Sequence, residues 1–184
     1  MGTMLEEIKT PIDNMVQGLA FWIAYKGEIS TIDLTEADIV SEAAHILSTR
    51  FSNYYIKREV EYSLLDTSLP KQYADLGIYS REDKGCKCVI EFKLGDNTNG
   101  GYKRDIQKIS DIKKARPDID CLVVIAYRTS CTAKVPKELV TNQGRAKRGT
   151  IRYAKVSVKV RRVCNAMRSI AANKMKKVVC LEIL

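Results

Sequence analysis

Residues 86–94 read CKCVIEFKL, an apolar stretch of the length and composition expected for a central strand. Because successive side chains of a strand point to opposite faces, Ile90 and Phe92 share one face while Glu91 and Lys93 share the other. The apolar face predicts packing against a core. The opposite face carries an acid and an amine side by side, which indicates a chemical role.

A second acid lies on the preceding strand-like segment. Residues 72–80 read QYADLGIYS, and Asp75 lies on the face opposite to the apolar residues of that segment. The polar residues 81–85, REDKG, predict a hairpin connection to residues 86–94. If the two strands pair, Asp75 converges with Glu91 and Lys93. The sequence therefore predicts two carboxylates and an amine within reach of one metal ion.

Two helices are expected before these strands. Apolar residues recur at helical spacing from Leu5 up to Gly27, and Pro11 predicts a kink or a break in that helix. Thr35 has the spacing of a capping box with the acid three residues later, so a second helix begins there and runs to about Asn53.

The rest of the chain alternates between strand and helix patterns. The expected elements are strands over residues 55–65, 72–80 and 86–94, a helix over 102–116, a buried strand over 121–127, a loop over 129–149, a strand over 150–160, a helix over 163–174 and a closing strand over 178–184. From residue 35 to residue 127 the order is α-β-β-β-α-β. This order predicts an α/β protein with a mixed central sheet flanked by helices.

Length and charge define the expected organisation. We expect a single domain over residues 1–184, with a core at about 35–127, an extra N-terminal helix and a basic C-terminal extension at about 128–184. Residues 1–100 hold 10 Lys and Arg against 16 Asp and Glu, whereas residues 101–184 hold 21 against 6. The acids therefore lie with the candidate metal site, and the bases suit a polyanionic partner.

Composition excludes several other classes. The six cysteines show neither C-x-x-C pairs nor zinc-finger spacing, which favours reduced thiols in the core, and a single histidine cannot build a histidine-based metal site. No apolar run is long enough to cross a bilayer, and the N-terminus lacks a secretory signal, so we expect a cytoplasmic protein without a membrane partner.

Asp75, followed by Glu91-x-Lys93 at the end of a strand and then by a helix and another apolar strand, resembles the PD-(D/E)xK nuclease superfamily. Asp75 matches its first acid, Glu91 its second acid and Lys93 its lysine, while Ala74 replaces its proline. The resemblance covers about the middle third of the chain. It implies the restriction-endonuclease-like fold and a nuclease that depends on Mg²⁺, with Mn²⁺ as a substitute. It also implies cleavage of DNA rather than RNA, by an endonuclease of the restriction, repair or phage-defence kind.

The resemblance also implies roles for individual residues. Asp75 and Glu91 would bind the metal through carboxylate oxygens, and the backbone carbonyl of Phe92 would add a ligand. Lys93 would stabilise the charge of the transition state or orient the attacking water.

Two further residues are expected from the flanking helices. Glu42 is the best placed acid on the helix before the sheet, because it borders the apolar stripe, while Glu36 and Asp38 are its rivals. Gln107, on the helix after the sheet signature, matches a polar residue that some branches of the superfamily place there to orient water or to contact phosphate.

Basic residues of the second half are expected to contact phosphates, which fixes position on a nucleic acid without reading its sequence. Only one aromatic residue, Tyr153, lies in the densest basic tract, so duplex is favoured over single strands. Because one small domain cuts both strands only as a dimer or by sequential nicking, a homodimer is one expected assembly. The predicted contact residues are Lys103, Arg104, Lys108, Arg145, Lys147, Arg148 and Arg152, in a tract that continues through Lys155, Lys159, Arg161 and Arg162.

Other interpretations stay open. Asp75, Glu91 and Lys93 would also fit a salt-bridge ladder across two strands, with each pair worth roughly 0.2–1 kcal/mol. The protein would then be a catalytically inactive or partner-dependent nucleic-acid-binding module of the same fold. An RNase acting on structured RNA and a ribosome-type RNA contact are further alternatives.

Overall fold

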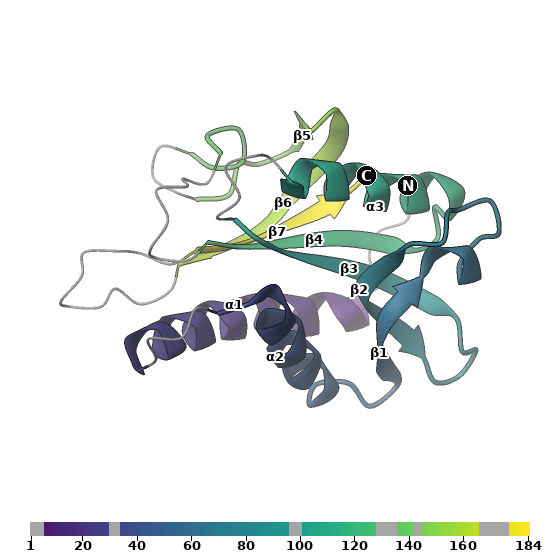
Figure 1. Cartoon of the computed structure of the whole chain (residues 1–184), viewed down its shortest axis with the longest axis horizontal. Helices are drawn as coiled ribbons and strands as arrows, with labels where there is room; N and C mark the ends of the chain where they lie inside the picture. Colours follow the sequence, from purple (N-terminus) through teal and green to yellow (C-terminus); the bar gives the residue numbers. More distant parts are fainter. Residues whose placement is uncertain (1–5, 30–33, 96–100, 128–135, 142–144, 166–176) are drawn as a thin grey trace.

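The computed structural model describes residues 6–29, 34–95, 101–127, 136–141, 145–165 and 177–184. These residues form three α-helices and one mixed seven-stranded sheet, which confirms the predicted α/β class. The elements are α1 (Glu6–Ile29), α2 (Glu36–Ser48), β1 (Tyr54–Glu61), the 3₁₀-helix η1 (Tyr62–Leu64), β2 (Tyr73–Ser80), β3 (Cys86–Leu94), α3 (Gly101–Ala115), β4 (Asp120–Tyr127), β5 (Thr150–Tyr153), β6 (Val156–Asn165) and β7 (Lys177–Ile183). Figure 1 shows α1 and α2 on one face of the sheet and α3 on the other.

The strands lie in the order β1-β2-β3-β4-β7-β6-β5. β3 and β4 are parallel and are connected through α3, whereas the other five neighbouring pairs of described strands are antiparallel. From α2 to β4 the elements follow the predicted order α-β-β-β-α-β. Because β3 and β4 are parallel, their carboxyl ends lie together at one end of the sheet. Ligand sites of parallel strands are formed at such ends, and Lys93 lies there, paired in register with Ile125.

Hydrophobic cores fill the space on both faces of the sheet. α1 and α2 pack against the face that carries Ile90 and Phe92 of β3. Strand alternation therefore places Glu91 and Lys93 on the opposite face, under α3. α3 covers that face with the three buried isoleucines that its spacing predicts, Ile106, Ile109 and Ile112.

The helices before the sheet differ from the prediction in two places. α1 is continuous through Pro11, so the predicted break is wrong. The apolar residues on both sides of Pro11 are fully buried, and this packing outweighs the loss of one helical hydrogen bond. α2 ends at Ser48 rather than near Asn53, because the hydroxyls of Ser48 and Thr49 bond back to carbonyls of the last turn and compete with continuation of the helix.

Two predicted strands are also interrupted. The strand expected over 55–65 ends at Glu61, and η1 follows it. The strand expected over 150–160 is a hairpin, in which Ala154 and Lys155 form a two-residue turn with φ of 52° and 64°. Such a turn normally carries Asn or Gly, which tolerate positive φ, so Ala-Lys provided no signal for it.

The C-terminal strands are part of the sheet rather than an extension added to it, because β7 pairs with β4 and β6 pairs with β7. Residues 163–165 belong to β6, so the predicted helix over 163–174 is wrong at its start. The rest of that prediction, and residues 129–135 and 142–144 of the predicted loop, lie outside the described residues.

Arg161 of β6 connects this region to α1. Its side chain is only 7% exposed; Nε lies 3.0 Å from Asp13 Oδ1, and Nη1 lies 3.9 Å from Glu182 Oε2. Its Nη2 also donates to the carbonyl of Lys9. Arg161 therefore has a structural role, and its assignment to phosphate contact is wrong.

The described cysteines are free thiols, four of them buried and Cys86 half-buried, which agrees with reduced core positions. Burial raises the pKa of the Cys180 thiol to about 12, so the thiol stays protonated at neutral pH. Cys131 lies outside the described residues. Among the helices of the described ranges, none has both the length and the apolar character needed to cross a membrane.

Candidate functional site

Pairing of β2 with β3 brings the first predicted acid to the predicted signature. Leu76 pairs with Ile90 in an antiparallel register, so the preceding Asp75 lies beside Glu91. The backbone N–H of Phe92 donates a hydrogen bond of 2.7 Å to Asp75 Oδ2, which fixes the orientation of this carboxylate. The carbonyl of Phe92 as a metal ligand stays a prediction.

Lys93 lies at the centre of a group of acids from four elements. Its Nζ is 2.7 Å from Glu36 Oε1, 3.1 Å from Glu91 Oε1 and 3.9 Å from Asp105 Oδ2. The Lys93 side chain is 17% exposed, so it is mostly buried but still partly accessible to solvent. We call Glu36, Asp75, Glu91, Lys93 and Asp105 the carboxylate cluster.

Local structure explains why α2 delivers Glu36 to this cluster. Thr35 Oγ1 accepts from the backbone N–H of Asp38, and Asp38 Oδ2 accepts from the backbone N–H of Thr35, which completes a capping box. The box starts the helix at Glu36, so this residue projects from the first turn of α2 toward the end of β3.

The end of β3 is held in place by a close contact with β4. The backbone N–H of Gly95 donates to the carbonyl of Ala126, and a Cβ at position 95 would lie 2.4 Å from the ring of Tyr127. Any side chain other than hydrogen would therefore displace the ring. This contact fixes the point at which the chain leaves the sheet, two residues after Lys93.

Burial and mutual charge raise the pKa values of the central acids. Burial, followed by the charge of Asp75, raises the pKa of Glu91 to about 7. Burial likewise raises the pKa of Asp75, although the hydrogen bond from Phe92 opposes the change. For Lys93, burial opposes the charged amine, but the charges of Glu91 and Glu36 outweigh it and raise the pKa. Lys93 is therefore protonated at neutral pH.

The cluster has more acid than base. The cluster holds four carboxylates, three of them within 4 Å of the Lys93 amine, and one further amine, that of Lys108, lies 3.0 Å from Asp105 Oδ1. Glu91 Oε2 is buried and has no hydrogen-bond partner among the described residues. An unpaired buried carboxylate oxygen is costly unless a cation or a donor reaches it.

These residues fit a hard divalent cation by their chemistry, since carboxylate oxygens are the ligands that Mg²⁺ prefers. The side chains supply the right kind of ligand atom, but they are not already arranged around a site for the ion. Within the described ranges, no three acidic, histidine or cysteine side chains are grouped closely enough to hold a metal as they stand. Instead, the amine of Lys93 lies between the carboxylates of Glu36, Glu91 and Asp105.

The flanking helices contribute acids other than the one predicted. Glu36, treated as a rival, contacts Lys93, whereas Glu42 lies six residues later, about 9 Å further along α2. Asp38 is used in the cap. Asp105 was missed, although its position four residues before buried Ile109 was a usable signal, because that spacing puts it beside the inward face of α3.

Gln107 points to a different part of the molecule. Its Nε2 donates a 3.2 Å hydrogen bond to the carbonyl of Ala154 in the β5–β6 turn. Two residues along a helix are separated by roughly 200° around its axis, so Gln107 and Asp105 lie on opposite sides of α3. In this structure Gln107 therefore does not face the carboxylate cluster, which argues against its predicted role in orienting water there, while phosphate contact stays a prediction.

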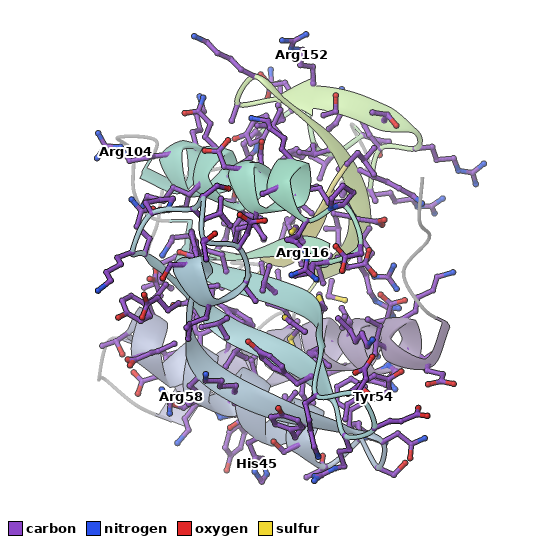
Figure 2. The ribbon with its side chains drawn as sticks, turned by 90° about the vertical axis from the view of Figure 1, so that its right-hand side faces the viewer. His45, Tyr54, Arg58, Arg104, Arg116 and Arg152 are labelled. Carbon is purple, nitrogen blue, oxygen red and sulfur yellow. The ribbon has the colours of Figure 1, made fainter. Side chains whose placement is uncertain are left out.

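The predicted phosphate-binding residues are divided between different environments. Lys108 neutralises Asp105, and Lys103 Nζ lies 6.0 Å from the centre of the Tyr153 ring. Arg104 and Arg152 project outward from the half of the molecule that contains α3 (Figure 2). The remaining predicted contacts are exposed or half-buried on the segment that precedes β5, namely Arg145, Lys147 and Arg148.

Comparisons of the chain with protein-family models, with curated proteins and with solved structures found no match. Its function is therefore inferred from the geometry and the electrostatics of the carboxylate cluster.

Proposed function

We propose that this protein is a metal-dependent nuclease of the PD-(D/E)xK type, with the restriction-endonuclease-like fold, that hydrolyses phosphodiester bonds of DNA. The observation that carries the proposal is the convergence of Asp75, Glu91 and Lys93 at the carboxyl end of β3, where Glu91 Oε2 is buried and finds no hydrogen-bond partner in the described part of the chain. The α2-to-β4 element order and the basic second half of the chain support it.

Asp75 and Glu91 would hold Mg²⁺, or Mn²⁺ in its place, together with the carbonyl of Phe92. When bound, the ion would stabilise negative charge on the phosphate and lower the pKa of a coordinated water. Before binding, the carboxylate of Asp75 is already oriented by the N–H of Phe92.

Lys93 would act on the substrate directly. Its amine is kept protonated by Glu91 and Glu36, and a phosphate oxygen would approach this amine. A charged N–H donor placed where negative charge develops stabilises the transition state. Glu36 and Asp105 would position the amine, because they hold it from two helices on different sides of the strand.

A second candidate function is a nucleic-acid-binding module that does not cleave. The observation that favours it is the place of the Lys93 amine among three carboxylates, where it already compensates part of their charge. In such a module the cluster would be a structural ion-pair network. A titration with Mg²⁺ separates the two functions, because only the nuclease requires the metal to bind in a manner that depends on Glu91.

The decisive experiment is a cleavage assay with plasmid DNA, duplex oligonucleotide and RNA, in Mg²⁺, in Mn²⁺ and in EDTA. We expect cleavage of DNA that requires the divalent ion. Glu91→Ala and Lys93→Ala should each lower the rate by at least about 100-fold, the order expected for loss of a group that stabilises the transition state.

Lys87→Ala is the matched control, because Lys87 lies on the same strand and pairs with Asp83, away from the cluster. Absence of cleavage of every substrate in both metals would refute the nuclease proposal. Cleavage of RNA alone would support metal-dependent phosphodiester hydrolysis but would refute DNA as the substrate.

A further inference from the structure

A cleft of about 560 Å³ lies on the side of α3 that faces the β5–β6 hairpin. This is the side of α3 opposite to Asp105, so the cleft and the carboxylate cluster are separated by the helix. A volume of this size is in the range of small-ligand sites. The side chains that matter for its chemistry are Gln107, Ser110 and Lys114 from α3 and Arg152, Lys155 and Ser157 from the hairpin.

The charge of the cleft is positive. Lys114, Arg152 and Lys155 line it, against a single acidic side chain, Asp111, which lies 2.8 Å from Lys114. Arg152 and Lys155 have no acidic partner among the described residues and are both exposed. Hydroxyl and amide groups and two apolar residues, Val156 and Leu184, complete the lining. The cleft therefore offers cations and hydrogen-bond donors to an oxygen-rich anion.

The hairpin wall of the cleft is held in a strained conformation. Ala154 and Lys155 both have positive φ, which residues with a Cβ rarely adopt. The amide of Gln107 donates to the carbonyl of Ala154 and thereby fixes the turn to α3. A turn selected for stability alone would carry Asn-Gly here. Lys155 at the second position places a cation at this wall of the cleft.

We propose that this cleft, the α3–hairpin cleft, binds phosphate groups of a nucleic-acid backbone and holds the substrate next to the cleavage site. The inference rests on the proposed function for the identity of the ligand. The cleft and the carboxylate cluster lie on different sides of the same helix, α3, so a backbone bound in the cleft would lie about one helix width from the candidate metal site.

The test measures binding rather than turnover. Anisotropy of a fluorescein-labelled 20-base-pair duplex is recorded in EDTA at several salt concentrations, with the full chain. Arg152→Glu together with Lys155→Glu should lower the affinity at least about 10-fold. The neutral pair Arg152→Ala and Lys155→Ala should reduce the slope of log Kd against log salt by roughly 2, since each lost phosphate contact removes about 0.9.

Lys57→Glu with Arg58→Glu is the matched control. It makes the same change of charge at two exposed residues of β1, and Arg58 lies in the half of the molecule opposite to Arg152 (Figure 2). This pair should leave the affinity within about twofold of the wild type. An equal loss in both double variants would show a diffuse electrostatic effect and would overturn the assignment of the cleft.

Turn variants separate binding from folding. Ala154→Gly and Lys155→Gly both relieve positive-φ strain, so both should raise Tm. Only Lys155→Gly should weaken duplex binding, because Ala154→Gly retains the lysine. Unchanged binding by Lys155→Gly, or binding of inorganic phosphate or free nucleotide but not of duplex, would overturn the inference.

The two proposals fail in different ways. Duplex binding that depends on Arg152 and Lys155, without metal-dependent cleavage, would support the cleft and refute the nuclease. Metal-dependent cleavage with binding that is insensitive to both residues would support the nuclease and refute the cleft.

Discussion

Glu91 is a carboxylic acid in largely buried surroundings. Its side chain is 8% exposed, one oxygen lies 3.1 Å from the amine of Lys93, and the other has no partner among the described residues. Burial of a carboxylate in this way is unfavourable for folding, and Lys93 compensates it only in part. Groups with such perturbed pKa values are concentrated at functional sites, although structural ion pairs also produce them.

This environment predicts a pH-dependent stability of the metal-free protein. Folded Glu91 keeps its proton up to about pH 7, whereas a glutamate with the ordinary value of 4.5 has lost it, so the folded state binds more protons between these values. The contribution of Glu91 to stability is therefore fully present below pH 4.5 and is lost as the pH rises through 7. Raising the pKa from 4.5 to about 7 corresponds to a loss on the order of 3 kcal/mol.

Glu91→Gln should remove most of this loss, because a neutral amide does not ionise. Urea denaturation in EDTA at pH 5 and pH 8 gives the free energy of unfolding of the variant and of the wild type. The stability of the variant relative to wild type should increase from pH 5 to pH 8. A difference that stays constant between the two pH values would contradict the raised pKa.

At the level of elements, the N-terminus of α2 connects helix formation to the cluster. The capping box of Thr35 and Asp38 satisfies backbone N–H groups of the first turn, and the adjacent Glu36 contacts Lys93. An acid in the first turn also interacts favourably with the helix dipole. The start of this helix therefore contributes both to stability and to the position of the Lys93 amine.

Thr35→Ala should lower the free energy of unfolding by about 1 kcal/mol, the usual effect of losing an N-cap side chain. It should also slow metal-dependent cleavage, since Glu36 would no longer be held at the helix start. Ser41→Ala is the control, because its hydroxyl bonds only to the carbonyl of Ala37 within the exposed part of the same helix. Lower stability with an unchanged cleavage rate would show that the cap does not position Glu36.

At the level of the whole molecule, the N-terminal helix and the C-terminal strands hold each other in place. Arg161 lies between Asp13 of α1 and Glu182 of β7 and is almost completely buried. α1 also covers the face of the sheet on which Ile90 and Phe92 of β3 pack. Segments more than a hundred residues apart in the sequence therefore support the strand that carries Glu91 and Lys93.

Arg161→Met should lower the free energy of unfolding by about 2–3 kcal/mol, because it removes the buried cation between Asp13 and Glu182, although Arg162 remains 3.8 Å from Asp13 Oδ2. Arg152→Met, at an exposed position of the same basic tract, should change it by no more than about 0.5 kcal/mol. Chemical denaturation of the two variants checks this comparison, and similar effects at both positions would contradict the structural role of Arg161.

Local patterns were sufficient for part of the site. Asp75, Glu91 and Lys93 could be identified because strand alternation depends only on neighbouring residues. Glu36 and Asp105 could not be assigned in the same way. Each of these two acids lies on a helix, and the packing of the apolar stripe of that helix sets its rotation and its distance from the sheet. The positions of the acids in the sequence do not specify this packing.

The amino-acid sequence alone specified the order of elements from α2 to β4, the two faces of β3 and the separation of acidic and basic halves, since these follow from periodicity and composition. The tertiary structure decided which acids meet Lys93, that Gln107 faces the hairpin and that Arg161 is internal. It also imposed the Ala154–Lys155 turn, whose residues carry no local turn signal. These features depend on contacts between distant segments, and only the packed chain brings those segments together.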